Sequence, residues 1–228
     1  MEGKYRTILA DPPWRLQMAG QYNGKTRNER PRILPYPTMP LEQIKSLPVA
    51  ELAETGAHLW LWVTTGKLID GKPVIEAGFE LLRAWGFTYL QMLTWTKPSG
   101  FGNYFLSLTE HILFAYKNRC EFNRARYIKN AYDEVADAEP IDESYAWGRP
   151  KAGQHSRKPV GSYQLIESVS DEPRIELFAR PISPLFPKIP GWSTWGNEIQ
   201  SDIAFSQQPL PQPEAGEGNV SDNQARND

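Results

Sequence analysis

Residues 7–14 of this chain read TILADPPW, an apolar run followed by an acidic residue, two prolines and a tryptophan. Proline has no backbone N–H and cannot continue a hydrogen-bonded ladder. We therefore expect a buried strand over 7–10 that ends in a turn at Asp11. A second run, 59–63, is continuously apolar, which is typical of a central strand covered on both faces. These two runs predict the centre of a sheet.

Strand-like and helix-like segments alternate along the rest of the chain. Strand patterns occupy 88–96, 112–116, 175–179 and 192–195, whereas helical spacing occupies 41–52, 73–85 and 159–168. Pro48 is expected to break or bend the first helix, and Gly86 to end the second. This alternation predicts an α/β fold with a mostly parallel sheet. In such sheets ligands bind at the carboxyl ends of the strands, and Asp11 lies at such an end.

The 228 residues are enough for one domain, which we expect to span 1–205. The remaining residues, 206–228, are polar and contain four acids and one arginine, a net charge of −3. They hold too few large apolar side chains to offset the entropy of ordering, so a disordered acidic tail is predicted. Long irregular loops are expected over 15–37 and 118–155.

The composition excludes several classes of protein. The net charge is −2, so no strong electrostatic field attracts nucleic acid or anionic lipid to the whole surface. A single cysteine excludes a disulfide framework and a multi-cysteine zinc site, and no metal is expected. No apolar run reaches the ~18 residues of a membrane span, and the N-terminus has no hydrophobic signal core. We therefore expect a cytoplasmic protein without a membrane partner, with most of its 8 tryptophans in the core.

The tetrapeptide at 11–14 is suited to binding a planar group that carries an NH₂. We expect the carbonyls of Pro12 and Pro13 to stay free as acceptors, with the carboxylate of Asp11 beside them. Adenine is such a group, and stacking on Trp14 would contribute about 1–3 kcal/mol. Two acceptors on the amine favour a pyramidal nitrogen that can attack an electrophile placed opposite it. From these four residues alone, a simple strand-ending turn remains an equal alternative.

Asp11-Pro12-Pro13-Trp14 resembles the catalytic motif of the MT-A70 family of adenine-N(6) methyltransferases. The resemblance extends over nearly all of 8–198, which makes the match specific. The matching blocks follow in the family's order: PYPTM at 35–39, HLWLWVT at 58–64, WGF at 85–87, WTK at 95–97, EH at 110–111, SRKP at 156–159, ELFARP at 176–181 and GNE at 196–198.

The resemblance implies a Rossmann-like methyltransferase fold that is circularly permuted, with the catalytic strand first and the donor-binding part last. It implies S-adenosylmethionine as the methyl donor and a methyltransferase domain over 1–205. The implied catalytic residues are Asp11, Pro12, Pro13 and Trp14; the implied donor-binding residues are Asp11, Lys158, Phe178, Arg180, Asn197 and Glu198; and the implied substrate-binding residues are Tyr36, Lys97 and Glu110.

Two alternatives to these roles stay open. Lys158 and Arg180 can instead be solvated surface charges, and Glu110 can instead be a buried carboxylate paired with Lys97 or His111. The chemistry of the donor's parts agrees with the implied roles. Lys158 or Arg180 suits its carboxylate or ribose hydroxyls, Glu198 suits a ribose hydroxyl, and Phe178 suits its adenine.

The expected partner is nucleic acid, with DNA preferred over RNA because no additional RNA-binding domain is evident. Two loops with basic residues flank the proposed cleft in sequence and suit local contacts to phosphates. These basic residues are Arg15, Lys25, Arg27, Arg30, Arg32, Lys117, Arg119, Arg124, Arg126 and Lys129. The alternatives are an RNA methyltransferase, a non-catalytic nucleic-acid-binding subunit, and a methyltransferase of protein amides. A partner subunit or a homodimer is compatible with each of them.

Overall fold

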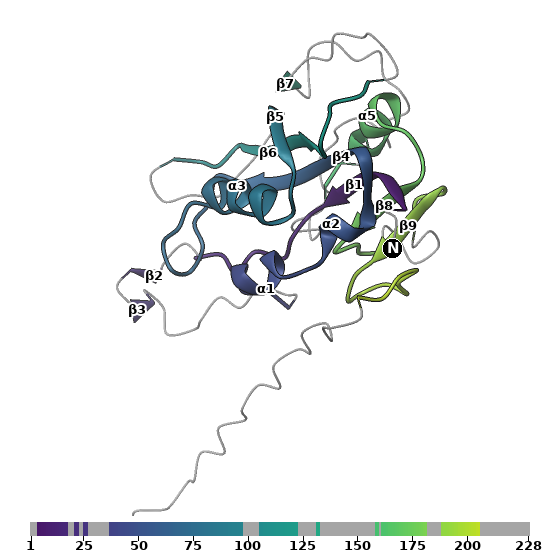
Figure 1. Cartoon of the computed structure of the whole chain (residues 1–228). Coiled ribbons are helices and arrows are strands. Elements are labelled where there is room, and N and C mark those ends of the chain that lie inside the picture. The colour runs from purple at the N-terminus through teal and green to yellow at the C-terminus, as the bar shows by residue number, and fades with distance from the viewer. Residues whose placement is uncertain are drawn as a thin grey trace, which may run out of the picture.

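The computed structural model describes residues 4–17, 21–22, 25–26, 37–97, 105–122, 131–132, 158–159, 161–181 and 188–205. Its main feature is a seven-stranded sheet with the order β7-β5-β6-β4-β1-β8-β9 (Figure 1). The strands of this sheet are β1 (Tyr5–Ala10), β4 (Ala53–Thr64), β5 (Thr88–Thr96), β6 (Thr109–Tyr116), β7 (Ala131–Tyr132), β8 (Arg174–Leu177) and β9 (Trp192–Trp195). β6 is antiparallel to both of its neighbours and the other pairings are parallel, which confirms the predicted mostly parallel sheet.

Helices cover both faces of the sheet. They are α1 (Leu41–Lys45), α2 (Val49–Leu52), α3 (Val74–Ala84) and α5 (Gly161–Val169). The strand β4 shows why helices pack on both faces of the sheet, because its side chains are apolar on both faces. Leu59, Leu61 and Val63 pack in one cluster with α1, α2 and α3, whereas Trp60 and Trp62 pack in a second cluster with α5. The result is a three-layer α/β domain.

The strand β1 lies inside the sheet, between β4 and β8. Ala10 pairs in parallel register with Leu61 on β4 and with Leu177 on β8. β1 and β8 therefore end level with one another, β4 extends from Leu61 to Thr64 beyond them, and the carboxyl ends of all three strands lie at one edge of the sheet. The prolines after Asp11 end β1 at this edge because they cannot extend the ladder.

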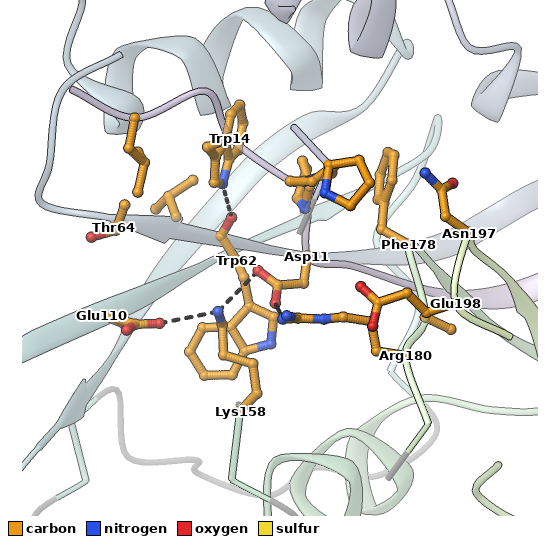
Figure 2. Close-up of a pocket in the computed structure, with 16 residues that line it drawn as sticks. Asp11, Trp14, Trp62, Thr64, Glu110, Lys158, Phe178, Arg180, Asn197 and Glu198 are labelled. Carbon is orange, nitrogen blue, oxygen red and sulfur yellow. Dashed lines mark hydrogen bonds and ion pairs between the residues drawn. The ribbon is translucent and has the colours of Figure 1, made fainter. Parts of the chain in front are cut away.

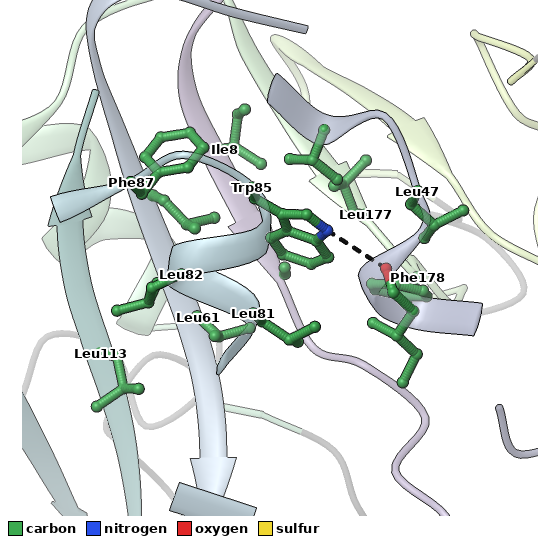
Figure 3. Packing of buried hydrophobic residues seen from close by; sticks show 14 of the residues in the cluster. Ile8, Leu47, Leu61, Leu81, Leu82, Trp85, Phe87, Leu113, Leu177 and Phe178 are labelled. Atoms are coloured by element: carbon green, nitrogen blue, oxygen red, sulfur yellow. Dashed lines mark hydrogen bonds between the residues drawn. The ribbon is translucent and has the colours of Figure 1, made fainter. Parts of the chain in front are cut away.

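The helix α3 is fixed by its last turn. Trp85 is buried, and its indole N–H donates to the carbonyl of Ile44 at 3.3 Å, which ties α3 to α1 (Figure 3). Gly86 has a φ of +73°, the left-handed conformation that ends a helix and that glycine adopts at little energetic cost. The predicted end of this helix at Gly86 is confirmed.

Most predicted elements are present, although the bounds of several differ. The predicted helix over 41–52 is broken at Pro48, as expected. The strand predicted at 59–63 begins earlier, at Ala53, and the strand predicted at 175–179 ends at Leu177 because Phe178 has a φ of +62°. Short strands also occur inside both predicted loops, as β7 and as the hairpin of β2 (Gln21–Tyr22) and β3 (Lys25–Thr26). The predicted tail at 206–228 lies outside the described residues, and the domain boundary at 205 stays a prediction.

Within the described ranges, none of the helices combines the length and the apolar character needed to span a bilayer.

The packing of α3 on the sheet yields a stability prediction. A β-carbon at Gly78 would lie 2.6 Å from Cγ1 of Val63 and 2.9 Å from Cδ1 of Leu113. Gly78→Val should therefore lower the free energy of unfolding by about 1–3 kcal/mol through overpacking. Urea denaturation measures this difference. The control is Ala84→Val at an exposed position of the same helix, and an equal loss in both variants would contradict the close approach at Gly78.

Candidate active site

A cleft lies at the edge of the sheet where β1, β4 and β8 end. Its empty volume is about 810 Å³, a figure that includes space open to solvent. Figure 2 shows that side chains from segments far apart in sequence point into it. The lining residues are Asp11, Pro12, Pro13, Trp14, Leu16, Pro37, Trp62, Val63, Thr64, Glu110, Lys158, Phe178, Ala179, Arg180, Asn197 and Glu198.

The carboxylate of Asp11 is held by two cations. Its Oδ1 lies 2.9 Å from Nζ of Lys158, and its Oδ2 lies 3.6 Å from Nη2 of Arg180. The side chains of Asp11 and Lys158 are mostly buried, so solvent screens their interaction weakly. The alternative of Lys158 as a solvated surface charge is therefore wrong. Both pairs leave lone-pair sites on the carboxylate for a further donor.

Glu110 extends this arrangement on the other side of Lys158. Its Oε2 lies 3.2 Å from Nζ of Lys158, and its Oε1 accepts a hydrogen bond from Nζ of Lys97 at 2.9 Å. Burial acts to raise the pKa of Glu110, but the two lysines outweigh it and the pKa is lowered. Burial likewise acts to lower the pKa of Lys158, but Asp11 and Glu110 outweigh it and that pKa is raised. Glu110 and Lys158 therefore both stay charged near neutral pH.

These contacts decide between the two interpretations of Glu110 only in part. The pairing with Lys97 is present, whereas His111 uses its Nδ1 in a hydrogen bond of 3.0 Å with Thr94. A contact of Glu110 or Lys97 with a target base stays a prediction. Tyr36 lies outside the described residues.

The sequence had led us to expect two free proline carbonyls, but both of them accept backbone hydrogen bonds. The backbone N–H of Trp14 donates to the carbonyl of Pro12 at 2.8 Å, and that of Met39 donates to the carbonyl of Pro13 at 2.9 Å. The turn closes on itself and binds the segment at Met39, so each carbonyl already has one donor. A carbonyl oxygen has two lone pairs, which leaves one further acceptor position on each.

Trp14 acts first as an anchor of this turn. Its indole N–H donates to the backbone carbonyl of Trp62 at 3.3 Å, and its ring is buried, although part of it lines the cleft. Two strand ends, β1 and β4, are therefore joined directly behind Asp11. Stacking of Trp14 on a ligand stays a prediction.

The other wall of the cleft follows β8 and β9. Phe178 comes directly after β8, and its positive φ is a strained conformation for a residue with a side chain. The turn places the Phe178 ring against Trp195, with 5.3 Å between the ring centroids, at the wall of the cleft. Asn197 and Glu198 follow β9 and are exposed at the mouth. Asp11, Lys158 and Asn197 therefore face one cavity although they lie far apart in the sequence.

Glu176 lies on β8 beneath this wall, on the face that α5 covers. Its carboxylate accepts a hydrogen bond of 2.8 Å from the hydroxyl of Tyr163. Burial raises the pKa of Glu176 to about 7; the charge of Asp11 adds to this, whereas Tyr163 and Arg180 oppose it. Glu176 is therefore the group beside the cleft whose charge changes near neutral pH.

The expectation for the second basic loop is wrong where the structure describes it. Lys117 follows the end of β6, which is antiparallel to β4, so it lies at the opposite end of the sheet from the cleft. Its Nζ donates to the carbonyl of Ala53 at 2.8 Å, and Arg119 pairs with Glu121. Arg15 is exposed beside the cleft residue Trp14. The other basic residues of the two loops either lie outside the described residues or have no described side chain.

Sequence reasoning missed several residues of the cleft. Trp62, Val63 and Thr64 were assigned only to a core strand, but they form the carboxyl end of β4 and line the cavity. The signal that could have found them is the alternation of strand and helix patterns in the sequence. This alternation predicts parallel strands, whose carboxyl ends lie at the same edge of the sheet. Leu16, Pro37 and Ala179 line it as well, and no chemical property of these side chains singles them out.

Comparison with known proteins is decisive for the family. The model of the MT-A70 family matches residues 5–198, which is most of the chain. The chain belongs to the MT-A70 family. The fold of this MT-A70 chain is accordingly Rossmann-like, and the circular permutation that the resemblance implied stays a prediction.

The similar proteins fall into two groups by length. The chain is 28% identical over 207 residues to a putative N(6)-adenosine-methyltransferase MT-A70-like protein of Medicago truncatula, and 28% identical over 199 residues to the N(6)-adenosine-methyltransferase catalytic subunit METTL3 of Homo sapiens. These matches cover 86% of this chain but only 27% and 28% of the relatives. The type II methyltransferase M.MunI of a Mycoplasma species is 29% identical over 220 residues, which cover 86% of this chain and 78% of the relative.

The raised pKa of Glu176 leads to a prediction about stability. The pKa rises from 4.5 to about 7 on folding, so the folded chain keeps a proton that the unfolded chain releases. The stabilisation is complete below pH 4.5 and is lost as the pH rises through 7. Glu176→Gln should remove this loss. Between pH 5 and pH 8, the free energy of unfolding of the variant should therefore rise relative to that of the wild type by up to about 3 kcal/mol.

Urea denaturation of the wild type and the variant at both pH values measures this difference. Glu51→Gln, which changes an exposed carboxyl on α2 in the same way, is the matched control. If the stabilities of the wild type and Glu176→Gln stay parallel between the two pH values, Glu176 does not titrate in this range.

Proposed function

We propose that this chain transfers a methyl group from S-adenosylmethionine to the exocyclic N(6) amine of adenine in nucleic acid, with DNA as the first substrate to test. The observation that carries the proposal is the carboxylate of Asp11. It lies at the end of an inner strand, is ion-paired with Lys158 and Arg180, and still has acceptor positions directed to a cleft. The family assignment and the names of the relatives support the same chemistry.

The chain's own contribution is positioning and electrostatics. An adenine amine is a weak nucleophile because its lone pair is delocalised into the ring. Asp11 accepts one N–H and the second lone pair of the Pro12 carbonyl accepts the other, so the nitrogen becomes more pyramidal with its lone pair directed away from both acceptors. The two cations restrain the direction of the Asp11 carboxylate. No covalent intermediate with the enzyme is needed, since the amine nitrogen forms the new bond to carbon and releases one proton to solvent.

The cleft has the set of groups that the donor requires. S-adenosylmethionine supplies, when bound, a methyl carbon on a sulfonium sulfur that leaves with the electrons of the broken bond. Its amino-acid end carries a carboxylate and an ammonium group and requires partners of both charges. Its ribose requires hydrogen-bond acceptors, and its adenine requires a flat apolar surface. Arg180 and Lys158 suit the carboxylate, Glu198 and Asn197 suit the ribose hydroxyls, and Phe178 suits the adenine. All five residues line the cleft that Asp11 also lines.

The substrate must present a single adenine to this cleft. A base within a duplex is extruded at an energetic cost of a few kcal/mol, which a single-stranded substrate avoids. Tyr36, Lys97 and Glu110 are the proposed contacts on the substrate side. Because the chain spans about a quarter of the N(6)-adenosine-methyltransferase relatives, RNA and a partner subunit belong among the conditions of the test.

The test offers purified protein and labelled S-adenosylmethionine to unmethylated DNA, to RNA and to protein. Asp11→Asn keeps the size of the side chain but removes its charge, and it should lower transfer to adenine about 10²–10³-fold. Asp70→Asn, in an exposed turn, is the matched control and should leave the rate unchanged. Circular dichroism checks that both variants are folded.

Three outcomes would contradict the proposal. Transfer by Asp11→Asn at the wild-type rate would remove Asp11 from the chemistry. Tight binding of nucleic acid with no transfer under any condition would favour a non-catalytic subunit. Transfer only to protein would favour the protein-amide alternative.

A further inference from the structure

Trp62 is the residue of the cleft with the least conventional surroundings. It lies near the carboxyl end of β4 and is only 1% exposed, yet its indole lines the cleft beneath Asp11 (Figure 2). The Nζ of Lys158 lies 5.3 Å from the centre of its ring. This is within the ~6 Å at which a cation is attracted to the negative face of an aromatic ring.

The indole N–H of Trp62 makes no hydrogen bond to any residue that the structure describes, although it is fully buried. Buried tryptophans normally direct this group to an acceptor. Four other tryptophans do so here: Trp14 to the Trp62 carbonyl, Trp60 to Ser170, Trp85 to the Ile44 carbonyl and Trp192 to Glu167. The ring also packs in the core, where it meets Trp95 edge to face with 6.0 Å between the ring centroids. Its charged partner is met through the face of the ring rather than through the N–H.

That partner is a desolvated ammonium group. The Nζ of Lys158 lies 2.9 Å from the Asp11 carboxylate and 3.2 Å from that of Glu110. The Trp62 ring is a third neighbour of this nitrogen, with its centroid 5.3 Å away. A ring face attracts the ammonium without accepting a directional hydrogen bond, so it restrains Lys158 without drawing it away from either carboxylate.

We propose that Trp62 is a positioning residue that holds the ammonium of Lys158 between Asp11 and Glu110 through its aromatic face. Through Lys158 it keeps the Asp11 carboxylate turned toward the cleft. The same residue restrains the catalytic turn a second time, because its backbone carbonyl accepts the indole N–H of Trp14. The kinetic consequence of this inference rests on the proposed function, whereas the contact itself does not.

A double-mutant cycle on unfolding measures the contact without any assay of activity. Trp62→Leu, Lys158→Met and the double variant are unfolded in urea at pH 7. We expect a coupling of about 3-fold to 30-fold in the unfolding equilibrium constant. Trp62→Phe retains a ring face and should retain most of this coupling. Trp60→Leu, combined with Lys158→Met, is the matched control on the same strand and face, and its coupling should be absent.

A fluorinated tryptophan at position 62 covers the case in which Trp62→Leu fails to fold. Each added fluorine keeps the shape of the ring and reduces the negative potential of its face. The coupling to Lys158 should fall stepwise with the number of fluorines. The proposal would be overturned if Trp62→Leu changed the unfolding equilibrium constant equally in the wild type and in Lys158→Met. A coupling that did not change with the number of fluorines would overturn it as well.

Methyl transfer provides a second readout. Trp62→Phe should keep kcat within about threefold of the wild type, whereas Trp62→Leu should lower kcat by at least tenfold with a smaller change in the KM of the nucleic acid. Equal losses in both variants would overturn the positioning role. If the wild type itself transfers no methyl group, the proposed function fails, and the unfolding cycle still decides whether Trp62 and Lys158 interact.

Discussion

The ion pair between Asp11 and Lys158 is the interaction on which the rest of the site depends. It joins the end of the first strand to a segment that lies far along the chain, at a distance of 2.9 Å between charged atoms. Both side chains are largely removed from solvent, and each has one further partner of opposite charge, Arg180 for Asp11 and Glu110 for Lys158. Losing one partner of a buried pair typically costs about 3–5 kcal/mol, and these further partners offset part of that cost. The cleft therefore keeps its shape only while both strand ends stay together.

The same pair is the middle of a row of alternating charges. Lys97, Glu110, Lys158, Asp11 and Arg180 follow one another across the cleft, and each carboxylate lies between two cations. These contacts restrain the side chains, and the two lysines lower the pKa of Glu110. Glu176 lies beneath the row, where burial and the charge of Asp11 raise its pKa instead, and its carboxylate accepts a hydrogen bond from the hydroxyl of Tyr163. Glu110 and Glu176 thus differ because contact with cations dominates at the first and burial dominates at the second.

Several expectations failed because they concerned contacts between distant segments. The carbonyls of Pro12 and Pro13 were expected to be free, but the turn after β1 closes on its own backbone and on Met39. Lys117 was assigned to a nucleic-acid-binding loop, but the antiparallel β6 carries it to the far end of the sheet. Trp62 was assigned to the core, which is correct, and the same ring also lines the cleft. In each case the local sequence is compatible with more than one role, and contacts between distant segments decide which role or roles the residue has.

The sequence by itself determined the elements that depend on local properties. Apolar runs ending at proline or glycine predicted β1, α3 and the α/β class, since burial and backbone freedom are properties of each segment. The ordered motif blocks also determined the family. Tertiary structure alone decided the pairing of Lys158 with Asp11 and Glu110, the titration of Glu176, and the ring of Trp62 under an ammonium group. Those features depend on distances between segments that lie far apart in sequence. A lysine a few ångströms further from Asp11 and Glu110 would be a surface charge and would not organise the cleft.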